Sequence, residues 1–114
     1  MHELSIAHSI LAIAEKAAEV NSNGVVTAVG LQIGALSGIE TGSLEFAFSV
    51  IRDGTRLQHA ELNIELIEGE AVCLDCSHIF PVNNYAVLCP QCNSNAMKIL
   101  KGKELKVVNI TIED

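Results

Sequence analysis

The sequence predicts an α+β fold: a three-stranded sheet with two helices, plus an inserted zinc-ribbon-like lobe. Three observations predict it. Apolar residues recur with helical period in two segments. They alternate with a period of two in three other segments. All four cysteines fall into two Cys-x-x-Cys pairs, which lie between the last two alternating segments. One sheet, backed by helices and interrupted by a metal-stabilised insertion, accommodates all of these segments.

The first helix is expected over residues 4–19. One side of its helical wheel carries the apolar residues, which are Leu4, Ile6, Ala7, Ile10, Leu11, Ile13, Ala14, Ala17 and Ala18. The other side is polar and includes His8, which we expect to be solvated. The residues from Asn21 to Gly24 favour a turn and should end the helix.

A strand and a second helix should follow. Residues 25–33 alternate as a strand, and the small residues on its reverse side indicate close packing there. After a loop at 34–42, Thr41 or Ser43 is expected to cap the second helix. Its buried stripe is predicted to contain Leu44, Ala47, Phe48 and Ile51. The pair Asp53 and Gly54 should end it.

Two further strands are predicted at residues 61–68 and 105–112, and the cysteine region separates them. We therefore expect residues 1–69 and 103–114 to form one α+β domain. Residues 70–102 would form a zinc-binding lobe that leaves the sheet near Gly69 and rejoins it after Gly102.

The cysteine pattern indicates a metal site. Four soft thiolates from two facing pairs suit tetrahedral zinc, and they leave no open coordination position. Such a site is structural rather than catalytic. Iron in a rubredoxin-like site is the main alternative, and the four thiols would also permit disulfides. A redox dithiol would need only one pair, at a strand-to-helix junction. The predicted zinc ligands are Cys73, Cys76, Cys89 and Cys92. His78 would contact these ligands rather than the metal.

Composition narrows the function classes. The chain has 114 residues, with 49% hydrophobic and only 4% aromatic residues, so its core must consist of aliphatic side chains. A formal charge of −7 disfavours nucleic acid, although Lys98, Lys101 and Lys103 form a local basic cluster. No segment resembles a transmembrane helix or a secretory signal, so we expect no membrane association and a cytoplasmic location. No nucleophile with an orienting base and no phosphate loop is recognisable, which argues against an enzyme.

The N-terminus is a candidate chelator. A free α-amine and a histidine imidazole both offer lone pairs near neutral pH, and in Met1-His2-Glu3 they are separated by one peptide bond. The backbone amide between them closes chelate rings when a strongly binding divalent metal displaces its proton. Nitrogen donors in a plane suit nickel(II) or copper(II). Taken alone, however, a histidine at position 2 is more often part of a frayed terminus.

Several segments in one order resemble a known family. They are Met1 to Ser5, the apolar helix, residues 33–40, residues 44–48, the two cysteine pairs and residues 102–107. Together they resemble the HypA/HybF family of nickel chaperones for hydrogenase maturation, through nearly the whole chain. Asn93 stands where glycine is common after the second pair, which removes no ligand.

The resemblance implies a metallochaperone that carries Ni(II) to the large-subunit precursor of nickel-iron hydrogenase, together with a HypB-type GTPase. It implies a nickel site built from Met1, His2 and Glu3, with Glu40 as a neighbouring carboxylate, and structural Zn(II) at the four cysteines. We expect a monomer or a homodimer. The alternative is a zinc-ribbon adaptor for protein interactions in which His2 has no role. These two readings differ at the N-terminus.

Overall fold

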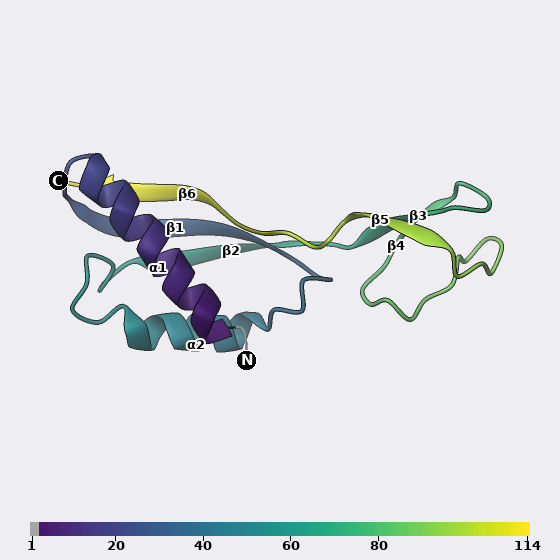
Figure 1. Cartoon of the computed structure of the whole chain (residues 1–114), viewed down its shortest axis with the longest axis horizontal. Helices are drawn as coiled ribbons and strands as arrows, with labels where there is room; N and C mark the ends of the chain where they lie inside the picture. Colours follow the sequence, from purple (N-terminus) through teal and green to yellow (C-terminus); the bar gives the residue numbers. More distant parts are fainter. Residues whose placement is uncertain (1–2) are drawn as a thin grey trace. The chain divides into compact units, whose positions relative to one another are not determined.

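The computed structural model describes residues 3–114 and contains two helices, α1 (Glu3–Val20) and α2 (Thr41–Ile51) (Figure 1). The strands form two three-stranded sheets, ordered β2-β1-β6 and β4-β3-β5. Their bounds are β1 (Val25–Gly34), β2 (Glu61–Ile67), β3 (Glu70–Cys73), β4 (Ile79–Pro81), β5 (Met97–Lys101) and β6 (Leu105–Glu113). The predicted α+β fold class, with the cysteine region inserted before the last strand, is confirmed.

The chain divides into two compact units. Unit 1 contains the described part of Met1–Leu31 together with Ile39–Ile64 and Val107–Asp114. Unit 2 contains Gln32–Gly38 and Glu65–Lys106. The domain boundaries at 69/70 and 102/103 proposed from the sequence stay a prediction.

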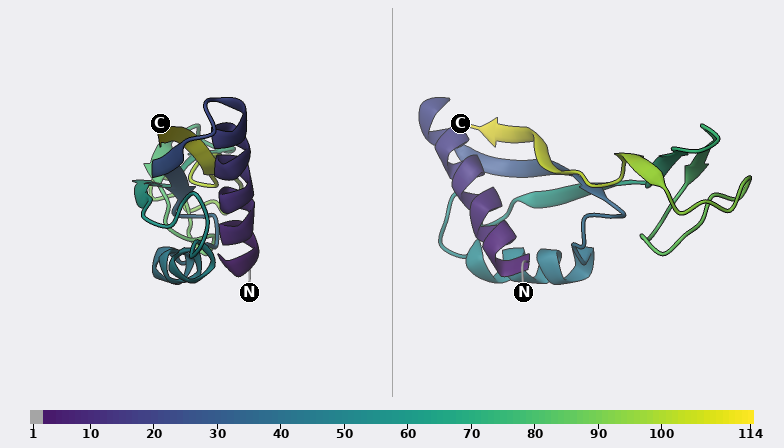
Figure 2. Two further views of the ribbon diagram at one scale, coloured as in Figure 1. Left: turned by 90° about the vertical axis from the view of Figure 1, so that its left-hand side faces the viewer. Right: turned by 45° about the vertical axis from the view of Figure 1, so that its right-hand side comes forward.

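In unit 1, α1 lies across one face of the sheet and packs against α2 (Figures 1 and 2). Its buried stripe is narrow and consists of Ala7, Ile10, Ala14 and Ala18. Small alanines allow the helix to approach its neighbours closely. The margins of the predicted apolar face therefore stay outside the core, and Leu4 and Ile13 are about half exposed (47% and 50%). The apolar side of the helical wheel is therefore wider than the buried stripe.

The turn after α1 forms as the sequence predicts. The Asn23 N–H donates to the Ala18 carbonyl at 2.8 Å, and Asn23 adopts a left-handed φ of 59°. Asparagine tolerates this conformation better than most residues with a Cβ. The helix therefore ends at Val20 and the chain enters β1.

The N-cap of α2 differs from the prediction. Glu40, and not Thr41 or Ser43, occupies the cap, with an extended backbone at φ −91° and ψ 113°. Its carboxylate accepts the Gly42 N–H at 3.0 Å and the Ser43 N–H at 2.9 Å. Glutamate has one more methylene than the usual cap residues, so a search for serine, threonine or aspartate overlooks it.

The two phenylalanines of α2 lie on opposite sides of the helix. Of the predicted buried stripe, Leu44 and Phe48 are buried, whereas Ala47 and Ile51 are only half-buried. Phe46 is 72% exposed, whereas Phe48 is only 2% exposed. The helix therefore presents a large aromatic side chain away from the core.

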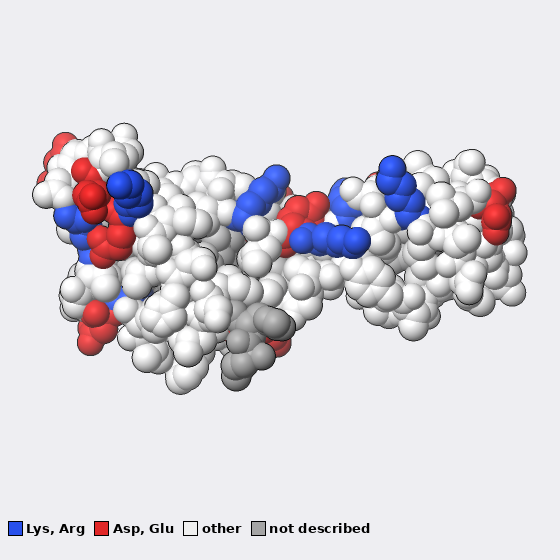
Figure 3. Space-filling model, viewed as in Figure 1, with Lys and Arg blue, Asp and Glu red and all other residues white. Residues whose placement is uncertain are grey.

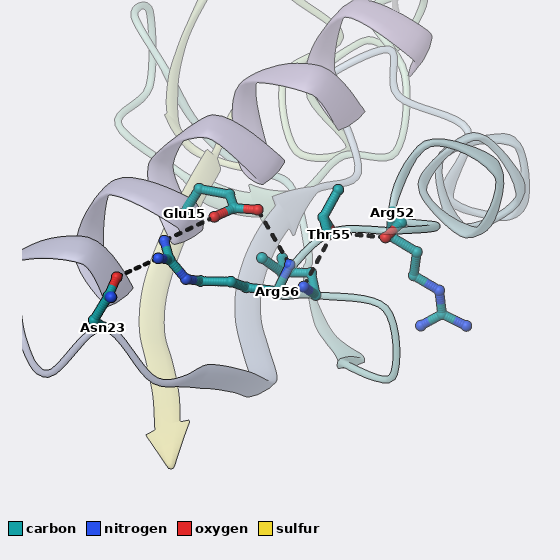
Figure 4. A network of polar contacts seen from close by, with 6 residues as sticks. Glu15, Asn23, Arg52, Thr55 and Arg56 are labelled. Carbon is teal, nitrogen blue, oxygen red and sulfur yellow. Dashed lines mark hydrogen bonds and ion pairs between the residues drawn. The ribbon is translucent and has the colours of Figure 1, made fainter. Parts of the chain in front are cut away.

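Unit 1 is tied together by a polar network outside its core (Figure 4). The Arg56 guanidinium forms an ion pair with Glu15 of α1 at 3.2 Å and also donates to the Asn23 side chain. The Arg56 backbone N–H donates to the other Glu15 oxygen at 3.2 Å. One arginine thus joins α1, the turn after it and the loop that follows α2.

Unit 2 has its own small core. β3 pairs antiparallel with β4 and with β5, and a register irregularity lies between Glu70 and Ala71. The core is made of Leu36, Ala71, Cys73, Phe80, Val82 and Cys89. A core of this size gives little hydrophobic stabilisation, so folding of such a unit depends on a further constraint such as a metal.

Three glycines allow close backbone contacts at the end of β1, just before β3 and just after β5. A Cβ on Gly34 would lie 1.9 Å from the Gly102 carbonyl oxygen. A Cβ on Gly102, whose φ is 117°, would lie 2.6 Å from the Gly69 Cα. Only residues without side chains fit this crossing.

No helix within residues 3–114 combines the length and the apolar character needed to cross a bilayer.

Candidate metal sites

The structure gathers the four cysteine sulfurs into one cluster. Their Sγ atoms all lie within 4.8 Å of one another. The Cys73–Cys92 distance is 3.5 Å and the Cys76–Cys89 distance is 3.6 Å. Sulfurs bound to one tetrahedral zinc at about 2.3 Å would be about 3.8 Å apart. The cluster therefore has the dimensions of a closed four-thiolate site.

The same distances argue against a disulfide. A disulfide requires a sulfur–sulfur distance of about 2.05 Å, and all four cysteines are free in the structure. The two close sulfur contacts also link the first pair to the second, rather than the two members of one pair. This crossed arrangement is that of one shared metal ion. Sulfur geometry by itself suits iron as well as zinc.

The two Cys-x-x-Cys pairs have equivalent backbones. The Ser77 N–H donates to the Cys73 carbonyl at 3.0 Å, and the Asn93 N–H donates to the Cys89 carbonyl at 2.8 Å. Ser77 and Asn93 both adopt a left-handed φ of 67°. The sequence interpretation noted Asn93 but missed Ser77, although both residues directly follow the second cysteine of a pair.

Backbone amides point at the sulfurs. The N–H groups of Asp75 and Cys76 donate to the Cys73 sulfur, each at 3.4 Å. The Cys76 N–H, together with that of Asp75, lowers the pKa of the Cys73 thiol to about 7 despite its burial. One thiol of the cluster is thus prepared for ionisation before any metal binds.

The other thiols resist ionisation. The Ser94 N–H favours the Cys92 thiolate, but the Cys73 thiol, burial and the other two cysteines outweigh it and raise the pKa of Cys92 to about 12. The His78 N–H favours the Cys76 thiolate, yet burial and the neighbouring thiols leave the pKa of Cys76 raised. Several thiolates cannot share this space without a cation, and a bound divalent ion would remove that restriction.

Polar groups around the cluster connect its two halves. The Ser94 hydroxyl donates to the Asp75 carboxylate across the site. The sequence interpretation missed both residues, which carry no motif of their own. The His78 ring stacks on Phe80 with 6.0 Å between the ring centroids, while the His78 carbonyl accepts the Cys73 N–H at 2.8 Å. His78 thus contacts Cys73, a candidate metal ligand, through its backbone.

The candidate nickel site lies at the start of α1. Met1 and His2, which carry most of the predicted donors, lie outside the described residues. The structure brings Glu3 and Glu40 together, because the Glu40 N–H donates to the Glu3 carboxylate at 3.2 Å. The Ser43 hydroxyl, followed by the Gly42 and Ser43 N–H groups, holds the pKa of Glu40 below its usual value. The Glu40 carboxylate is therefore ionised at neutral pH and already engaged in capping α2.

The chain matches one family model over residues 1–112, described as "Hydrogenase/urease nickel incorporation, metallochaperone, hypA". It is 47% identical over 113 residues to a hydrogenase maturation factor HypA of Parabacteroides distasonis, covering 99% of this chain and 98% of that protein. It is 45% identical over 116 residues to the HypA of Pelodictyon phaeoclathratiforme, covering 100% of this chain and 97% of that protein.

Solved structures are similar over the whole chain. The solution structure of the Ni metallochaperone HypA from Helicobacter pylori superposes with a TM-score of 0.65 at 28% identity, covering 98% of this chain and 97% of that one. A second solution structure, of a HypA protein, gives a TM-score of 0.70 at 30% identity, covering 99% and 97%.

Proposed function

This chain belongs to the HypA family of nickel-incorporation metallochaperones for hydrogenase maturation, and we propose that it binds Ni(II) at its own N-terminus for delivery. Members of this family are maturation factors rather than enzymes, so this chain is not an enzyme. The proposed donors are the Met1 amine, the His2 imidazole with its amide, and the Glu3 amide. The proposed recipient is the large-subunit precursor of nickel-iron hydrogenase.

The proposal rests on the contrast between the two candidate metal sites, the cysteine cluster and the N-terminus. The four sulfurs form a closed set in which no position is open for transfer. Nitrogen donors at a chain end can lose a metal to an incoming ligand one bond at a time. Transport therefore belongs to the N-terminus, and the cysteine cluster is left with a structural role.

We assign Zn(II) to that structural role, with Cys73, Cys76, Cys89 and Cys92 as ligands. The sulfur spacing supports this assignment, and so does the small core of unit 2, which needs a further constraint to fold. When bound, zinc would supply the charge that lets all four thiols ionise. The backbone N–H groups aimed at the Cys73 sulfur would then stabilise the anionic site.

Delivery would involve a GTPase of the HypB type, because this chain contains no glycine-rich phosphate loop of its own. Free thiols at a site of this kind support a reducing, cytoplasmic location.

Nickel titration of untagged, metal-defined protein tests the proposal. His2→Ala, or one residue added before Met1, should abolish stoichiometric nickel binding while zinc content is unchanged. His8→Ala is the matched control, because it removes an exposed histidine of α1 that is not among the proposed donors. Cys73→Ala should do the reverse and lower zinc content first.

Two results would reject the nickel proposal. Unchanged nickel affinity in both N-terminal variants would favour the zinc-ribbon adaptor. If nickel spectra showed only thiolate ligands and the His2 imidazole resonances did not shift, nickel binding would have to be assigned to the cysteines.

A further inference from the structure

Unit 1 carries an exposed apolar surface next to the start of α1. Phe46 is 72% exposed and Val50, one helical turn further along α2, is 59% exposed. Leu4 of α1 is 47% exposed. All three border one open hollow of about 520 Å³, which Glu3 and Glu40 also line. We call these three side chains and the hollow the α2 surface.

The exposure of Phe46 needs an explanation. Among the described large apolar residues that are exposed, Phe46 is the most exposed. Scattered exposed aliphatic residues are common, but an aromatic residue with an apolar partner at i+4 beside a hollow is typical of a contact surface. Aromatic anchors that become buried on association contribute much of the affinity of protein interfaces.

Charges at the margin define what can cover the α2 surface. Figure 3 shows a largely uncharged area over α2, with acidic side chains and some basic atoms at its edges. Glu3 and Glu40 line the hollow, and Glu45 precedes Phe46 on the exposed part of the helix. Neither helix has a basic residue in its last turn. A formal charge of −7 over the whole chain has the same sign. Anionic lipid and nucleic acid are therefore repelled, whereas a basic protein segment is attracted.

From these observations we propose that the α2 surface docks the protein that receives nickel, through a segment presenting apolar side chains flanked by lysine or arginine. This inference rests on the proposed function, because Glu3 belongs both to the proposed nickel site and to the lining of the hollow. A recipient seated there would have its own metal ligands beside the N-terminus. An open hollow suits side chains of a docked protein better than a small molecule, which is usually enclosed.

The test measures binding of the nickel-free, zinc-loaded chain to the purified hydrogenase large-subunit precursor. Phe46→Ser should weaken this binding about 10-fold or more, and Val50→Ser should weaken it in the same direction. Leu66→Ser is the matched control, because Leu66 is similarly exposed at 67% but lies on β2. It should bind as the parent does. Thermal unfolding should be unchanged for Phe46→Ser, since that side chain is outside the core.

Charge reversal gives a second arm. Glu45→Lys should slow association and reduce its dependence on salt, while Glu19→Lys, with the same change in net charge on α1, should not. Unchanged affinity for Phe46→Ser, or equal losses for Phe46→Ser and Leu66→Ser, would overturn the proposal. Loss of a homodimer in sedimentation of Phe46→Ser would overturn it as well, because the occupant would then be a second copy.

The two proposals fail separately. If the parent chain binds no nickel at its N-terminus, the nickel proposal fails whatever happens to docking. If it binds nickel but Phe46→Ser binds the precursor normally, only the docking proposal fails.

Discussion

The backbone N–H of Glu40 donates a hydrogen bond to the carboxylate of Glu3, so the residue that caps α2 is bonded to the first turn of α1. The two residues are far apart in sequence, and the contact places the start of the chain's first helix against the start of its second. Glu40 therefore acts on both helices, through its amide on one and its carboxylate on the other.

Removing this cap should lower stability. Glu40→Ala loses the acceptor for the Gly42 and Ser43 N–H groups, and we expect a measurable decrease in the free energy of unfolding. Urea denaturation of zinc-loaded protein measures it. Glu45→Ala, an exposed glutamate on the same helix, should be nearly neutral; equal losses in both variants would contradict the capping role.

The cap also gives a pH dependence. Hydrogen bonds from Ser43 and Gly42 lower the pKa of Glu40 in the folded protein. A lowered folded pKa means that the contribution is present above the unfolded pKa and is lost as pH falls through the folded pKa. In acid, the difference in stability between the parent and Glu40→Ala should therefore shrink.

Zinc affinity should fall steeply with pH. The pKa of Cys92 is raised to about 12 and that of Cys76 is raised as well, so both thiols are protonated at neutral pH without metal. Zinc must displace these protons, and two displaced protons correspond to about 100-fold weaker binding per pH unit of acidification. Chelator competition at two pH values measures the slope. A slope near zero would show that zinc does not bind these thiols.

The residue after each cysteine pair offers a stabilising substitution. Ser77 adopts a left-handed φ that glycine accepts without strain, so Ser77→Gly should stabilise unit 2 by about 1 kcal/mol. Asn93→Gly should gain less, because asparagine tolerates the conformation. Ser77→Val should lose stability. Rates of zinc release to a chelator rank the three variants, and a ranking with Ser77→Gly fastest would contradict the strain argument.

The arginine network should contribute modestly to unit 1. Glu15→Ala removes an ion pair whose side chains are about 30% exposed, and it also removes the acceptor of the Arg56 backbone N–H. We expect a loss of about 1 kcal/mol, of which the charge accounts for only part. Glu15→Gln should recover some of it, and Glu19→Ala serves as the control on α1. A loss for Glu19→Ala equal to that for Glu15→Ala would contradict the network.

Much of the fold could be predicted from periodicity, and the failures have physical causes. The ends of α1 and α2 were predicted closely because asparagine and glycine turns follow both helices. The exposure of Leu4 and Ile13 was not predicted, because a helical wheel gives the direction of a side chain but not the width of the surface that covers it. The wheel likewise set Phe46 outside the buried stripe without indicating how far it projects.

The candidate sites were predictable to different degrees. Two Cys-x-x-Cys pairs predict a cluster, because this spacing is typical of a four-thiolate metal site. The structure brings their sulfurs together. The hydrogen bond between Ser94 and Asp75 could not be predicted, since it depends on how the two Cys-x-x-Cys pairs face each other. The Glu3–Glu40 contact joins distant residues and leaves no local pattern in the sequence.

The glycine crossing has a consequence for protein engineering. Glu70 and Lys101 are cross-strand neighbours, and Gly69 and Gly102 touch just beyond them. Residues 70–101, between these two glycines, therefore begin and end at nearly the same point. Insertions with this geometry tolerate replacement. A two-residue hairpin turn could therefore replace residues 70–101, whereas a transplanted segment would need a host side chain in place of Leu36, which the rest of the chain contributes to the core of unit 2.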